Sequence, residues 1–150
     1  MMTYKGNIVD VCNNTIFLGE FDVDNQHISA IRYLGEEQKD VPYFLPGFVD
    51  AHVHIESSLL PPAQFARLAV THGTVGTVSD PHEIANVLGI DGVKFMIENG
   101  RKVSFHFCFG APSCVPATTF ETAGATVDVK DIEALFAYPE IGYLAEMMNF

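Results

Sequence analysis

The sequence predicts an α/β fold in which a β-rich module, residues 1–45, precedes four strands joined by three helical connections, residues 46–150. Two observations lead to this prediction. Short segments rich in β-branched and aromatic residues follow one another up to residue 45, and strand-like and helix-like segments alternate after it. Such alternation predicts parallel strands with right-handed crossovers, either in an open doubly wound sheet or in a (β/α)8 barrel.

The β-rich module contains three strand-like segments, which are residues 7–11, 15–23 and 27–34. Asn13-Asn14 and Asp24-Asn25 separate them, and such pairs are typical of turns. We therefore expect a small antiparallel sheet that forms part of a β-sandwich.

The second region opens with a strand, Phe48–His54, and continues through Leu60-Pro61-Pro62 into a helix-like segment, residues 63–73. Proline is tolerated in the first turn of a helix, and the glycine at the end of the segment favours the exit. Residues 74–80 form the second expected strand, and residues 103–111 form the third.

Asp91 and Asp128 are expected to be the N-caps of helices over residues 92–100 and 129–137. The fourth strand, residues 141–149, ends almost where the chain ends. A complete barrel takes roughly 200–250 residues or more, so we expect this chain to be the N-terminal piece of a longer protein, with half of a barrel. The open edge of the last strand invites pairing with another copy, and we expect a homo-oligomer.

Composition and charge exclude several classes of protein. Of the 150 residues, 48% are hydrophobic and 18% are charged, which is ordinary for a globular domain. The net charge of −11 comes without any run of Lys or Arg, so we expect no nucleic-acid partner. Three cysteines make no disulfide framework, and no signal peptide or membrane span is visible. We expect a cytoplasmic protein without a membrane partner.

The first strand of the second region carries two histidines that predict a metal site. Side chains two apart in a strand share a face, so Asp50, His52 and His54 point one way and Val49 and Val53 the other. A lone buried histidine is usually a hydrogen-bonded core residue. Two imidazoles on one face are instead a pair of metal ligands, and the apolar set is expected to pack against helices.

Polar residues also follow the other strands, at the edge where parallel sheets bind ligands. From the pattern alone, Asp80 and His82 are read as a turn before a helix. Glu146 interrupts the fourth apolar strand, where an unpaired buried carboxylate is costly, so we expect it to face a cation. Cys114 is expected to be a packing residue.

Four segments of this sequence resemble one enzyme family, and they are AHVHIESSLL, DPHEIANVLGIDG, PSCVPATTFETAGA and AEMMNF. The chain is similar over its whole length to the amidohydrolase superfamily and, within it, to the adenine deaminases of bacterial type. The resemblance implies the N-terminal part of a (β/α)8 (TIM) barrel preceded by strands of a small β-sandwich.

The resemblance also implies a function and a set of site residues. Members hydrolyse the small-molecule substrate adenine to hypoxanthine and ammonia with a binuclear divalent metal centre that takes manganese or iron, and also zinc. Carried over, the metal ligands are His52, His54, Asp80, His82 and Glu146, and the catalytic residues are Glu146 and Glu83. The ligands that the family takes from later strands have no counterpart in 150 residues, so the chain alone is expected to be inactive.

Two other interpretations remain open at this stage. The chain can be a non-catalytic truncated module that associates with itself through its open edge. Alternatively, it can belong to an amidohydrolase that acts on another cyclic amidine or amide.

Overall fold

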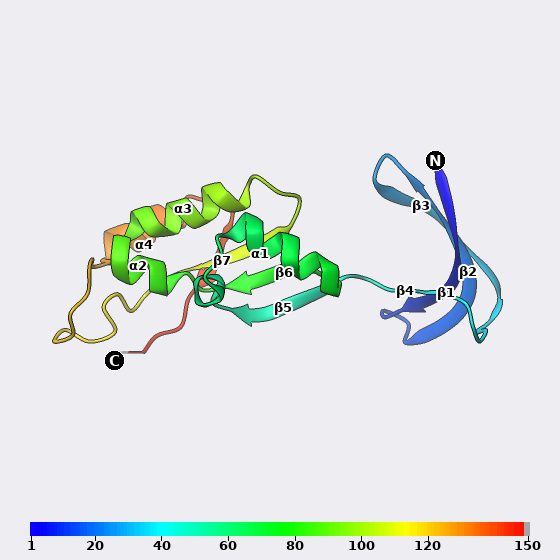
Figure 1. Cartoon of the computed structure of the whole chain (residues 1–150), viewed down its shortest axis with the longest axis horizontal. Helices are drawn as coiled ribbons and strands as arrows, with labels where there is room; N and C mark the ends of the chain where they lie inside the picture. The colour runs from blue at the N-terminus through cyan, green and yellow to red at the C-terminus, as the bar shows by residue number, and fades with distance from the viewer. Residues whose placement is uncertain (149–150) are drawn as a thin grey trace. The chain divides into compact units, whose positions relative to one another are not determined.

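The computed structural model describes residues 1–148 and divides the chain into two compact units, residues 1–46 and residues 47 onward. Each unit contains one four-stranded sheet (Figure 1). No helix formed by residues 1–148 is long and apolar enough to cross a bilayer.

The first unit is a sheet in the order β3-β2-β1-β4. Its strands are β1 (Met2–Asp10), β2 (Thr15–Asp24), β3 (His27–Glu36) and β4 (Tyr43–Phe44). The first three pair antiparallel, and β4 pairs parallel to β1. Asn14 and Asn25 occupy the left-handed region at the two hairpin turns, which Asn tolerates better than most residues. The antiparallel sheet predicted from the sequence is therefore confirmed, with strands longer than expected.

The second unit is an all-parallel sheet in the order β5-β6-β7-β8. Its strands are β5 (Phe48–Val53), β6 (Thr74–Ser79), β7 (His106–Ala111) and β8 (Ile141–Leu144). Consecutive strands are neighbours, and helices connect each pair, so the predicted α/β class is confirmed. In Figure 1 the arrowheads of β5 and β6 point toward α2, so that these carboxyl ends face the start of a helix.

The connections contain α-helices and short 3-10 turns. They are η1 (Ile55–Ser58), α1 (Pro62–Ala69), η2 (Val70–His72), α2 (His82–Leu88), α3 (Ile90–Gly100) and α4 (Val129–Leu135). Asp128 caps α4 as predicted, because its side chain accepts the Asp131 N–H while the Asp131 side chain accepts the Asp128 N–H.

Three sequence predictions need correction. Asp91 lies in the first turn of α3 and is not its N-cap, because Gly89 adopts a positive φ of 62° and turns the chain directly from α2 into α3. The third strand begins at His106, later than expected. The fourth strand ends at Leu144, so Glu146 follows the strand and does not interrupt it. The predicted strand end at Asn149 lies outside the described residues.

The core of the second unit lies between the sheet and the helices. Phe109 of β7 and Leu135 of α4 are completely buried, and Val93, Met96 and Ile97 of α3 pack into the same cluster. The prediction that the apolar face of β5 packs against helices was wrong in part, because Val49 is 62% exposed and Ala51 is exposed as well. Among the described residues β5 pairs with β6 on one side only, and only its last residue, Val53, packs against the core.

Candidate metal centre

The carboxyl end of β5 brings two imidazoles together. His52 and His54 lie two residues apart at the end of this strand, and their Nε2 atoms are 3.1 Å from each other. His52 is exposed, whereas the side chain of His54 is 22% exposed. When neither Nε2 atom carries a proton, the two imidazoles cannot hydrogen-bond to each other, and a cation between the two nitrogens is favoured.

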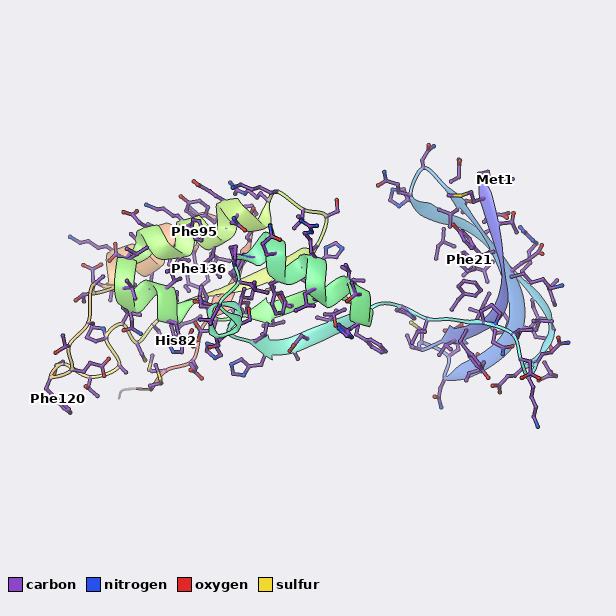
Figure 2. The ribbon with its side chains drawn as sticks, in the orientation of Figure 1. Met1, Phe21, His82, Phe95, Phe120 and Phe136 are labelled. Carbon is purple, nitrogen blue, oxygen red and sulfur yellow. The ribbon has the colours of Figure 1, made fainter. Side chains whose placement is uncertain are left out.

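The carboxyl end of β6 adds a carboxylate and a third imidazole. Asp80 follows β6 directly, and α2 begins at His82 after one proline. The His82 Nδ1 atom lies 3.2 Å from Asp80 Oδ2 and 3.7 Å from Glu146 Oε1. The rings of His54 and His82 meet edge to face, with centroids 4.8 Å apart. Figure 2 labels His82, which lies at the start of α2.

Three overlapping groups of side chains offer ligand atoms that lie within 4.8 Å of one another. They are His52, His54 and Glu146; His54, His82 and Glu83; and Asp80, His82 and Glu146. Every residue that the sequence nominated for the site is therefore in one connected cluster. Imidazole nitrogen and carboxylate oxygen together suit first-row divalent metals such as zinc, iron and manganese.

Buried polar atoms without partners show where a cation fits. Asp80 is only 3% exposed, and neither of its oxygens accepts a hydrogen bond from any described residue. The same is true of the buried Nδ1 atom of His82, which makes no hydrogen bond within residues 1–148. The 3.2 Å approach of His82 Nδ1 to Asp80 Oδ2 is an ion pair only when the imidazole is protonated, so a divalent cation would offset the cost of burying this carboxylate. The donor set and its geometry therefore fit a metal ion.

Glu83, the second residue of α2, orients one of the imidazoles. Its Oε2 atom is 3.0 Å from Nδ1 of His54. Partial burial disfavours the charged imidazole, but the hydrogen bond and charge of Glu83, with the charges of Asp80 and Glu146, outweigh it. The pKa of His54 is therefore raised above its ordinary value of 6.5. A carboxylate on the far nitrogen of a metal-binding histidine is a common arrangement.

Two residues near the cluster were missed by sequence reasoning. Burial raises the pKa of Glu56, whose Oε1 atom accepts the backbone N–H of Ile84 at 3.2 Å. Burial, together with the charges of Asp80, Cys108 and Glu146, raises the pKa of Tyr143 to about 12. Glu56 lies two residues beyond His54 and could have been found by that spacing, whereas nothing in the sequence distinguishes Tyr143.

Cys114, which was predicted to be a packing residue, and three further histidines lie outside the three ligand groups. Cys114 is buried, and its Sγ atom accepts the backbone N–H of Met148 at 2.8 Å. His27, His72 and His106 are exposed, and none of them belongs to the three ligand groups found among residues 1–148.

Comparison with known proteins gives a consistent picture. The pattern of the Amidohydrolase family matches residues 43–146. Proteins named adenine deaminase from Sulfurovum sp., Methanosarcina barkeri and Borreliella burgdorferi are 57%, 52% and 51% identical to the chain over 99%, 100% and 97% of its length. The chain spans only 28%, 27% and 27% of the length of these three relatives.

Proposed function

The chain belongs to the amidohydrolase family, and we propose that it supplies the first barrel strands and part of the metal centre of an adenine deaminase. The observation that carries the proposal is the convergence of His52, His54, Asp80, His82 and Glu146 at the carboxyl ends of three strands. The names of the relatives support adenine as the substrate.

The proposed reaction is hydrolytic. Water adds at C6 of the purine, the bond from C6 to the exocyclic nitrogen breaks, and hypoxanthine and ammonia leave. When bound, a pair of divalent metals would supply Lewis-acid chemistry and a hydroxide nucleophile at neutral pH. We propose manganese or iron for this pair, with zinc as a metal that the same nitrogen and oxygen donors also accept.

Each residue of the cluster has a proposed task. His52, His54, Asp80, His82 and Glu146 would hold the metals. Glu83 keeps the proton of His54 on Nδ1, so that Nε2 presents its lone pair to the centre. We propose Glu83 and Glu146 as the catalytic residues of this chain, because both are partly exposed carboxylates within the ligand groups and a carboxylate can accept a proton.

Further properties of the whole protein belong to the same proposal. Strands from elsewhere in the protein would complete a (β/α)8 barrel, and without them the chain is expected to be inactive. For the chain without those strands we propose a homo-oligomer, because β8 pairs only with β7 among the described residues and leaves an open edge. We propose a cytoplasmic location, because Cys12 and Cys108 form no disulfide among the described residues.

The test measures ammonia release by the full-length protein loaded with Mn²⁺ or Fe²⁺. Adenine is compared with guanine, cytosine and a cyclic amide such as hydantoin, and the chelated protein is the blank. Adenine is expected to be turned over with a kcat/KM far above that of the others. Turnover of another member of this panel in place of adenine would show that the substrate assignment is wrong.

A further inference from the structure

We propose that Glu56 is a positioning residue that fixes the start of α2, and with it His82 and Glu83, against the histidines of β5. No motif of the family resemblance assigns this residue a role, and the inference rests on the proposed metal centre. The supporting observation is a set of hydrogen bonds between η1 and α2.

The helix α2 lacks an N-terminal cap of its own. Its N-cap residue is Pro81, which has no side-chain acceptor, so the first backbone N–H groups of the helix need partners from elsewhere. Ile84 is the third helical residue, whose N–H is the usual target of a capping side chain. Glu56 Oε1 accepts that N–H at 3.2 Å from 28 residues earlier in the sequence. Glu56, from η1, thus caps the N-terminus of α2 in place of a local N-cap side chain.

A second contact joins the same two elements. Ser57 Oγ, the next residue of η1, donates to Glu83 Oε1 at 3.4 Å, while the other oxygen of Glu83 holds His54. These three contacts join the β5–η1 segment to Glu83 and Ile84, the second and third residues of α2. Together they set the distance between the imidazoles of β5 and the imidazole of His82.

The burial of Glu56 marks this contact as specific. Its Oε2 atom is buried and has no hydrogen-bond partner among residues 1–148. This desolvation disfavours the charged carboxylate, and it is offset in part by hydrogen bonds from the backbone of Glu56 itself and of Ile84 and by the charge of His54. We therefore infer that the role of this side chain is the hydrogen bond that Oε1 accepts from the first turn of α2. An amide of the same length, as in Glu56→Gln, keeps that acceptor.

The experiment measures metal binding and not only activity. The chelated full-length protein is titrated with Co²⁺, and the visible absorption bands report both the affinity and the ligand environment. We compare Glu56→Ala, Glu56→Asp and Glu56→Gln. Ser58→Ala is the matched control, because Ser58 Oγ donates within its own turn, to the carbonyl of Ile55.

Glu56→Ala and Glu56→Asp are expected to bind Co²⁺ about tenfold or more weakly, with altered bands, because outer residues of metal sites typically contribute that much. Glu56→Gln and Ser58→Ala are expected to match the wild type. The proposal is overturned if Glu56→Asp binds as well as wild type, if Glu56→Gln fails to restore binding, or if Ser58→Ala is equally weak. Adenine turnover is measured separately, so a wrong substrate leaves this result intact.

Discussion

Glu83 Oε2 lies 3.0 Å from Nδ1 of His54, although 29 residues separate the two in the sequence. This contact orients the imidazole. With the proton on Nδ1 donated to Glu83, the lone pair of Nε2 faces Nε2 of His52 at 3.1 Å. The Nε2 lone pair of His54 can then accept either an N–H of His52 or a metal cation, so the hydrogen bond to Glu83 prepares His54 as a metal ligand.

Glu83→Gln is expected to weaken metal binding by about 10- to 100-fold, because the amide oxygen still accepts the Nδ1 proton but no longer carries charge. Competition with a metal-sensitive dye measures the affinity. Glu133→Gln, on the exposed side of α4, removes the same charge from a distant position and should bind as wild type. Equal loss in both variants would mean that net charge, and not this contact, governs affinity.

The same contact makes a prediction about pH in the metal-free protein. The pKa of His54 is raised above 6.5, so its pairing with Glu83 stabilises the fold fully below the pKa of the unfolded state. That contribution is lost as the pH rises through the folded pKa. An NMR titration of the chelated protein should place the pKa of His54 above 6.5, and Glu83→Gln should lower it. An unchanged pKa in the variant would contradict this assignment.

The sequence predicted the parallel sheet and the ligands on β5 because both depend on local periodicity. Alternating segments require crossovers, and His52 and His54 share a face by strand geometry alone. The contact from His54 to Glu83 was not predictable, because it needs α2 to begin at His82, inside a segment read as a turn. Pro81 just before that helix was the available signal. The spacing from His54 could have pointed to Glu56, but not to the backbone N–H of Ile84 through which it acts.

Arg101 and Glu140 make another testable pair, at the opposite end of the second unit's helices. Arg101 Nε and Nη2 donate to the two oxygens of Glu140 at 2.6 and 2.9 Å, and the hydrogen bonds from Arg101 lower the pKa of Glu140. The stabilisation is present above the unfolded pKa of about 4.5 and is lost as the pH falls through the lower folded value. Arg101→Met should cost less than about 1 kcal/mol at pH 7, since the pair is solvent-accessible.

Urea unfolding of the wild type and of Arg101→Met at pH 7 and at pH 3 measures this difference. The two curves are expected to converge at the lower pH. A gap that persists at pH 3 would show that the guanidinium acts through packing, for instance on the ring of Tyr138, 6.0 Å away.

Phe109 is expected to dominate the stability of the second unit. It is completely buried in β7 beside Phe107, with ring centroids 5.5 Å apart. Phe109→Ala should lower the free energy of unfolding by about 3–5 kcal/mol, because the lost contacts leave a cavity. Phe120→Ala is the matched control, since Phe120 is 89% exposed and should change stability by less than about 0.5 kcal/mol. Similar losses in both variants would contradict the core as described.

Asp80 offers the sharpest test of the cation, because the expected effects of one substitution have opposite signs with and without metal. Its two oxygens are buried and accept no hydrogen bond from residues 1–148, and the contact with His82 Nδ1 at 3.2 Å is an ion pair only when that imidazole is charged. With a neutral imidazole, Asn at this position should therefore leave the metal-free protein as stable or more stable. Metal at 100 times its Kd should stabilise the wild type by about 2.7 kcal/mol and Asp80→Asn far less. Thermal melts with and without Mn²⁺ measure both. If Asp80→Asn destabilises the metal-free protein and keeps the metal response, Asp80 is a structural residue and does not hold the ion.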